Sequence, residues 1–167
     1  EVMVIACSDS RVDPAQIFDV DPGEIFVVRN VAALVPPFET TPGHHGVSAA
    51  LEFAVQVLKV KKIIVLGHGM CGGCKAALTR EMHGTKPGEG GFIADWIALL
   101  DEARDEVAHD HGTHGREAER AMDVYQQARG SYVKVLEEDP ENVEALEAVR
   151  RNDAARTEVQ REIEAER

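Results

Sequence analysis

The chain has 167 residues, of which 44% are hydrophobic and 29% charged, and its formal net charge is -12. A chain of this size and composition is expected to form one domain with a sizeable core, to which an appendage can be added. The acidic balance, without a basic stripe, argues against nucleic acid as a partner. Apolar runs stay well below about 18 residues and there is no signal-peptide pattern, so we expect no membrane contact and a cytoplasmic location.

Short apolar runs predict the strands of a buried, mostly parallel sheet near residues 2–6, 24–29 and 63–67. Before the third run, residues 43–58 carry apolar side chains at the spacing of one helix face. A strand, a helix and a strand in this order predict a right-handed parallel crossover. Asp13-Pro14 has the N-cap and first-turn residues of a helix start. We therefore predict a three-layer α/β domain.

The rest of the chain has a helical pattern. We predict a helix from Gly72 to about Met82 and a single amphipathic helix from Phe92 to Val107. A polar break at residues 108–115 separates these helices from a segment that is helical from Arg116 onward, with a junction at Asp139-Pro140. Because no strand pattern follows residue 70, the predicted fold ends in a helical C-terminal segment.

Candidate metal ligands follow two of the predicted strands directly. Cys7 ends the first apolar run, while His68 and Cys71 follow the third. Two thiolates and an imidazole suit a catalytic zinc site, and the soft thiolates favour zinc over magnesium or calcium. Taken singly, such a cysteine is more often a small buried hydrophobe and such a histidine a hydrogen-bonded core residue. The joint pattern favours a metal, with water or Asp9 as its fourth ligand.

Two neighbours of these ligands have a second interpretation. The guanidinium of Arg11 can hold the Asp9 carboxylate in a bidentate pair, which would free a metal position for water. A purely structural salt bridge is the alternative. Cys74 has the Cys-x2-Cys spacing of a zinc knuckle relative to Cys71. If a helix follows Gly73, however, Cys74 packs against the sheet, so we do not expect it to bind metal.

Four motifs, in this order and spacing, resemble the β-class carbonic anhydrases over residues 1 to about 122. They are Ala6-Cys7-Ser8-Asp9-Ser10-Arg11, Val28-Arg29-Asn30-Val31-Ala32, Ala50-Leu51-Glu52-Phe53-Ala54-Val55 and Gly67-His68-Gly69-Met70-Cys71-Gly72-Gly73. The resemblance implies a zinc lyase that reversibly hydrates carbon dioxide to bicarbonate and a proton. It implies zinc held by Cys7, His68 and Cys71, with Asp9 either as fourth ligand or paired to Arg11.

The same resemblance implies a narrow apolar cleft lined by Phe26, Val31 and Phe53, and a backbone N–H of Gly72 that orients a substrate oxygen. The implied partners are the small-molecule substrate and further copies of the chain, in a homodimer or a higher homo-oligomer. Hydrolysis of carbon disulfide or carbonyl sulfide on the same core is one alternative function. A zinc-stabilised scaffold without catalysis is another.

The chain departs from the family pattern at both ends. The family's helices before the first strand and its additional edge strands are absent from this sequence, and we expect their absence to weaken activity. Residues 132–146 weakly resemble a junction between tetratricopeptide repeats, although a binding solenoid needs about three repeats. We predict a zinc-binding α/β domain over residues 1–122. Residues 123–167 are interpreted as a helical extension that packs on this core, and an engineered origin is one hypothesis for it.

Overall fold

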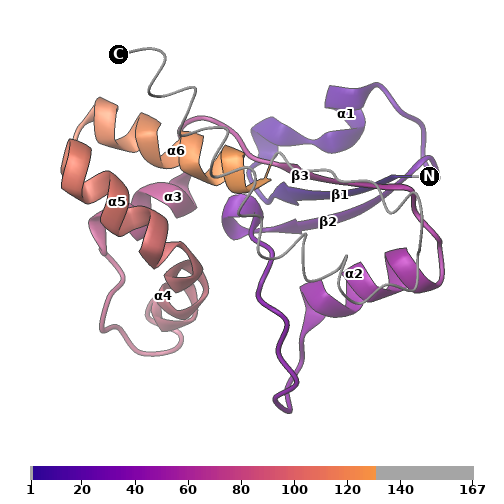
Figure 1. The fold of residues 1–167 in the computed structure, drawn as a ribbon, viewed down its shortest axis with the longest axis horizontal. Helices are drawn as coiled ribbons and strands as arrows, with labels where there is room; N and C mark the ends of the chain where they lie inside the picture. Colours follow the sequence, from indigo (N-terminus) through magenta and orange to yellow (C-terminus); the bar gives the residue numbers. More distant parts are fainter. Residues whose placement is uncertain (1, 131–167) are drawn as a thin grey trace.

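The structure is a computed structural model that describes residues 2–130, with side chains up to residue 125. The predicted helix junction at Asp139-Pro140 and the tetratricopeptide-like residues 132–146 therefore lie outside the described residues. Within these residues, strands and helices follow one another in the predicted α/β order (Figure 1).

Three parallel strands form the sheet of the described chain, in the order β2-β1-β3. They are β1 (Val2–Cys7), β2 (Ile25–Asn30) and β3 (Lys62–Leu66), close to the predicted positions. The register pairs Cys7 with Asn30 and Ala6 with Leu66, so the carboxyl ends of all three strands meet at one edge. The central strand β1 is almost completely buried, which explains its unbroken apolar run.

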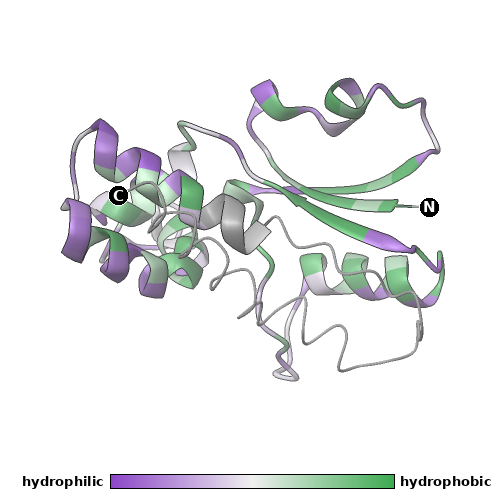
Figure 2. Ribbon diagram, turned by 45° about the horizontal axis from the view of Figure 1, so that its top comes forward, coloured by the Kyte–Doolittle hydropathy of each residue, from purple (hydrophilic) through white to green (hydrophobic). Residues whose placement is uncertain are grey.

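Helices cover both faces of this sheet. Figure 1 shows α1 (Pro14–Phe18) on one face and α2 (Gly46–Gln56) on the other, which confirms the three-layer α/β fold. The Asp13 carboxylate accepts a hydrogen bond from the backbone N–H of Gln16 at 3.2 Å, so the predicted helix cap is also confirmed. Figure 2 shows hydrophobic residues along the strands and on the side of α2 that faces them.

The later helices gather beyond the carboxyl ends of the strands (Figure 1). They are α3 (Gly72–Thr79), α4 (Gly91–Ile97), α5 (Asp101–His111) and α6 (Arg116–Gly130). Short 3-10 turns are η1 (Ser10–Val12), η2 (Val31–Ala33) and η3 (Ala98–Leu100). None of these described helices combines the length and the apolar character that crossing a membrane requires.

Three details of the helical prediction are corrected. The single helix predicted from Phe92 to Val107 is divided by η3. Buried Ile97, Leu100 and Ala103 lie three residues apart, a spacing that suits the tighter 3-10 repeat at this point. In addition, α3 ends at Thr79 rather than near Met82, and α5 continues to His111, inside the predicted polar break.

The predicted division after residue 122 falls inside α6 (Arg116–Gly130). Ala118 and Met122 of this helix belong to the hydrophobic core that also contains Met3 and Ile5 of β1. The start of α6 is thus part of the same core as the sheet. The separate extension over residues 123–167 stays a prediction.

Candidate metal centre

The predicted ligands meet at the carboxyl edge of the sheet. The Sγ atoms of Cys7 and Cys71 lie 3.9 Å apart, although 64 residues separate them in the sequence. The ligand atoms of Cys7, His68 and Cys71 all lie within 4.8 Å of one another, and all three residues are buried. Cys74 is also buried but is not part of this group, in agreement with its predicted place in the core.

The histidine presents one ring nitrogen to this cluster. Nδ1 of His68 lies 2.9 Å from the carbonyl oxygen of Gly69, so a proton on Nδ1 would donate there and leave Nε2 with a free lone pair. Nε2 is buried and has no hydrogen-bond partner among the described residues. An unpartnered buried polar atom costs about 1–3 kcal/mol, which a metal ion bound at Nε2 would remove. The donor set therefore fits a thiolate–imidazole metal site.

The thiols of the metal-free cluster hold their protons strongly. The contact with the Cys71 thiol, together with burial, raises the pKa of Cys7 to about 12. The pKa of Cys71 is also raised: its contact with Cys7 lowers it, but the Cys74 thiol and burial outweigh that effect. A bound dication reverses this preference, because it compensates the thiolate charges and releases the protons.

Asp9 is bound to Arg11 by both of its carboxylate oxygens. Nε of Arg11 donates to Oδ1 at 2.9 Å, and Nη2 donates to Oδ2 at 2.7 Å. This bidentate pair, joined by the backbone N–H of Arg11, holds the pKa of Asp9 well below its usual range. Of the two predicted arrangements of Asp9, the structure therefore contains the one paired with Arg11.

Arg29 organises the backbone around Cys7, a role that the sequence analysis did not assign. Its guanidinium donates to the carbonyl oxygens of Cys7 at 3.0 Å and of Asp9 at 2.6 Å, and it pairs with Asp13 at 3.2 Å. These bonds hold the loop on both sides of Ser8. The sequence feature that could have indicated this role is an arginine near the end of an otherwise apolar strand.

Asp123 of α6 is the second unassigned residue at the site. The residue is 6% exposed, and its carboxylate accepts hydrogen bonds from the backbone N–H groups of Met70 at 2.6 Å and Cys71 at 3.2 Å. Burial raises the pKa of Asp123, against the opposing effect of these N–H donors. The sequence feature that could have indicated a buried carboxylate is the position of Asp123 directly after Met122, on a helix whose apolar spacing marks a buried face.

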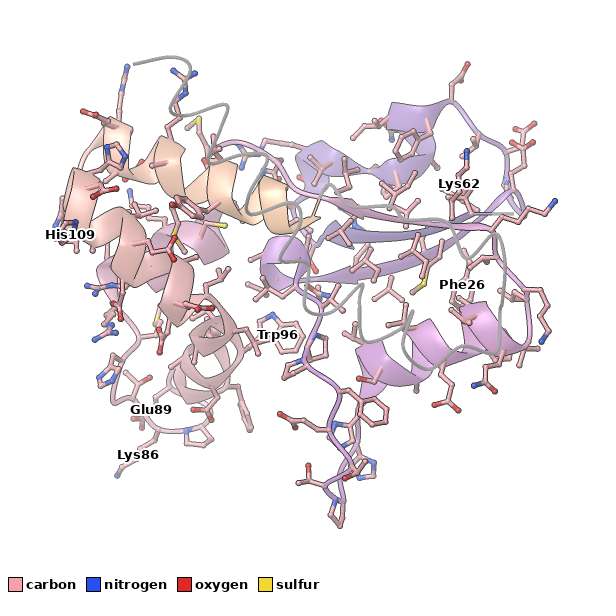
Figure 3. The ribbon with its side chains drawn as sticks, viewed as in Figure 1. Phe26, Lys62, Lys86, Glu89, Trp96 and His109 are labelled. Carbon is pink, nitrogen blue, oxygen red and sulfur yellow. The ribbon has the colours of Figure 1, made fainter. Side chains whose placement is uncertain are left out.

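The four predicted cleft residues fall into two groups. Gly72 begins α3 directly after Cys71, and Val31 follows Asn30, the strand partner of Cys7. Phe26 instead pairs with Met3, four positions before the strand ends, which is about 13 Å along β2. Its ring packs on Phe53 of α2 with centroids 5.8 Å apart, on the α2 side of the sheet (Figure 3). Of the four predicted cleft residues, only Gly72 and Val31 therefore lie at the edge of the sheet where the candidate metal ligands converge.

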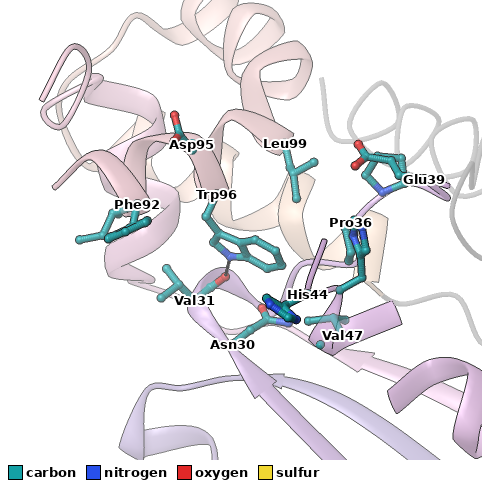
Figure 4. A pocket seen from close by; sticks show the side chains of 14 residues that line it. Asn30, Val31, Pro36, Glu39, His44, Val47, Phe92, Asp95, Trp96 and Leu99 are labelled. Carbon is teal, nitrogen blue, oxygen red and sulfur yellow. Dashed lines mark hydrogen bonds between the residues drawn. The ribbon is translucent and has the colours of Figure 1, made fainter. Parts of the chain in front are cut away.

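A pocket of about 640 Å³ opens beside this edge. Asn30 lines it from the end of β2, Val31 from η2, Trp96 from α4 and His44 from the loop before α2 (Figure 4). The Trp96 indole N–H donates to the Val31 carbonyl oxygen at 2.8 Å. This hydrogen bond connects α4 to η2, the turn that carries the predicted cleft residue Val31.

Comparisons with known proteins agree with this geometry. The family model for carbonic anhydrase matches residues 2–161. Beta carbonic anhydrase 3 of Arabidopsis thaliana is 43% identical over 108 residues, which are 65% of this chain and 41% of that protein. This chain therefore spans less than half the length of that curated relative.

Two solved structures extend the comparison. The Coccomyxa β-carbonic anhydrase in complex with acetazolamide is 38% identical, with a TM-score of 0.59 over 77% of this chain and 55% of that chain. One of the tetrameric β-carbonic anhydrases of Sordaria macrospora is 27% identical, with a TM-score of 0.62 over 89% of this chain and 68% of that one.

Proposed function

Since this chain belongs to the β-class carbonic anhydrase family, we propose that it binds zinc through Cys7, His68 and Cys71 and reversibly hydrates carbon dioxide to bicarbonate. One observation carries the proposal: two thiols and an unpartnered imidazole nitrogen converge, buried, at one edge of the sheet. Carbon dioxide and bicarbonate are accordingly the proposed small-molecule partners. A cytoplasmic location stays a proposal from the sequence.

The residues around the cluster have separate tasks in this reaction. Zinc, when bound, supplies the Lewis acidity that makes water a nucleophile near neutral pH. Arg11 keeps both oxygens of Asp9 engaged, so that the carboxylate leaves the fourth metal position to water. The backbone N–H of Gly72 orients a substrate oxygen, and the apolar Val31 side chain favours an uncharged substrate over water.

We also propose that the chain works as a homo-oligomer. Phe26 and Phe53 match cleft residues of the family, yet Phe26 lies about 13 Å from the level of Cys7 along the strand, and Phe53 packs on Phe26. The Phe53 side chain is 46% exposed, so it is available to line the cleft of a second copy. The tetrameric relatives from Sordaria macrospora support such an assembly.

The predicted alternatives gain no support of their own. The relatives reported above are named carbonic anhydrases, and no described feature favours carbon disulfide or carbonyl sulfide as the substrate. A scaffold without catalysis would share the zinc ligands and differ only in turnover. Activity therefore decides between the scaffold and the enzyme.

The test measures zinc content by mass spectrometry and carbon dioxide hydration by stopped flow. We expect about one zinc per chain and hydration faster than the buffer reaction. Cys7→Ala should lose both, because it removes a ligand. Cys74→Ala is the matched control: it also removes a buried thiol of the core, and it should keep its zinc. A zinc-loaded chain no faster than buffer would refute the proposed activity.

A further inference from the structure

One peptide unit beside the metal cluster, between Met70 and Cys71, is bound at both of its polar ends. Its N–H, that of Cys71, donates to Oδ1 of Asp123 at 3.2 Å. Its carbonyl oxygen, that of Met70, accepts from Nη2 of Arg11 at 3.0 Å. Asp123 and Arg11 therefore hold the same peptide plane, one through the N–H and the other through the carbonyl.

The backbone at this peptide needs such support. Met70 has a φ of +58°, in the left-handed region that residues with a Cβ seldom adopt. The residue is 78% exposed, so packing of its side chain does little to hold the conformation. The second bond to Asp123, from the N–H of Met70 at 2.6 Å, fixes the preceding peptide as well. The buried carboxylate is thus the main support of this turn.

The same peptide carbonyl also orients the guanidinium of Arg11. Nη2 carries two N–H groups, and this nitrogen contacts both Oδ2 of Asp9 at 2.7 Å and the Met70 carbonyl at 3.0 Å. Because the guanidinium is planar, an acceptor fixed at one N–H limits where the others can point. A rotation of the 70–71 peptide would remove that acceptor and loosen the bidentate pair with Asp9.

We propose that Asp123 is a positioning residue: through the 70–71 peptide it keeps Arg11 paired with Asp9, and so keeps Asp9 from occupying the fourth metal position. The proposal rests on the proposed zinc site and adds a control on its open coordination position. It connects α6, from a point 53 residues beyond Met70, to the Asp9–Arg11 pair that follows β1. Removing the Asp123 carboxylate should shift Asp9 towards the metal.

The test uses the full chain loaded with Co²⁺ in place of zinc, with azide as a probe of the open position. Azide that binds the metal changes the cobalt d–d absorption, whereas a metal already bound by Asp9 resists it. We expect Asp123→Ala to weaken azide binding about tenfold. Asp123→Asn keeps one acceptor and should weaken it about fivefold, as the loss of one hydrogen bond suggests. Both variants keep the three metal ligands and should still bind cobalt.

A double substitution separates positioning from general loosening of the site. In an Asp9→Ala background no carboxylate competes for the metal, so adding Asp123→Ala should leave azide binding unchanged. Glu119→Gln is the matched control on α6, one turn before Asp123; it removes the charge that pairs with Lys75 and should not alter azide binding.

Three results would overturn the proposal. Unchanged azide affinity in both Asp123 variants would remove the positioning role, with the zinc site intact. An equal weakening with and without Asp9 would show that Asp123 acts by another route. A wild-type chain that takes up no cobalt would defeat the proposed zinc function, and the positioning role with it.

Discussion

Cys7 lies where a second thiol and burial both disfavour a thiolate. The neighbouring groups are instead suited to binding a cation. The Sγ atom of Cys71 lies 3.9 Å from that of Cys7, and Nε2 of His68 has no hydrogen-bond partner among the described residues. Both thiols therefore keep their protons in the metal-free cluster, whereas a bound dication would compensate the charge of the two thiolates. This difference makes the stability of the metal-free protein depend on pH in a definite direction.

We expect the free energy of unfolding of the metal-free protein to fall as pH rises above about 9. An unfolded Cys7 ionises near its ordinary pKa of 9.0, whereas the folded thiol keeps its proton until about pH 12. Between these values the unfolded chain binds fewer protons, so stability falls by at most about 1.4 kcal/mol per pH unit for this thiol. Urea unfolding in chelator at pH 7, 9 and 10 measures the slope.

The control for this pH dependence is Cys7→Ala, which lacks the thiol. The slope of the wild-type protein should exceed that of the variant, because only the wild-type chain carries the Cys7 thiol. Saturating zinc should remove the difference, since the metal-bound thiolate has no proton to lose. Parallel slopes for the two metal-free proteins would contradict the expectation.

At the scale of elements, α3 and η2 touch directly. A Cβ built on Gly73 would lie 2.8 Å from Cγ1 of Val31 and 2.9 Å from Cβ of Ala32. The loop cannot easily retreat, because Ala32 has a φ of +62° and the Asn30 amide both donates to and accepts from the Leu34 backbone. The helix that follows Cys71 and the loop that carries Val31 are thus packed as one unit.

Gly73→Ala should therefore destabilise the protein by about 1–3 kcal/mol, the usual cost of overpacking a tight contact. Gly72→Ala is the matched control in the same helix, since its added methyl meets nothing within 4 Å. Alanine is the better helix former, so this control should be neutral or stabilising. Urea unfolding of both metal-free variants measures the difference, and equal midpoints would show that the contact yields without cost.

At the scale of the whole molecule, the described residues leave several large apolar side chains exposed near β2 and α2. The order β2-β1-β3 places β2 at an edge of the described sheet, and Phe53 of α2 and Val57 directly after this helix are exposed. Phe38, in the loop before α2, is also exposed. Large apolar side chains gathered on one side are typical of a surface that another chain covers. The proposed second copy would bury them and share Phe26 and Phe53 with its own site.

We expect light scattering to show at least a dimer for the wild-type chain. Phe53→Glu should raise the dissociation constant at least about tenfold, because it places a charge in an apolar contact. Gln56→Glu adds the same charge to α2, three residues further along, and should change assembly less. A wild-type monomer, or equal effects of the two substitutions, would contradict the proposed interface.

Several features of this protein follow from the sequence alone. The strands were predictable because a buried parallel strand requires a short run of apolar residues, as in Val2–Ala6. The candidate ligands Cys7, His68 and Cys71 were predictable because they stand at the ends of such runs or within a few residues of them, and parallel strands end at one edge. The pairing of Asp9 with Arg11 was one of two predicted arrangements, since residues so close in sequence meet in many turns.

Other features depend on packing between distant segments. The bonds from Asp123 to Met70 and Cys71 exist only because α6 packs beside the start of α3. Arg29 reaches the carbonyl oxygens of Cys7 and Asp9 because β2 lies next to β1 in this register. Local sequence determines periodicity and short-range spacing, but the direction in which a side chain meets a distant backbone is decided when the layers pack. The candidate metal ligands were therefore visible in the sequence, and the groups that hold the backbone around them were not.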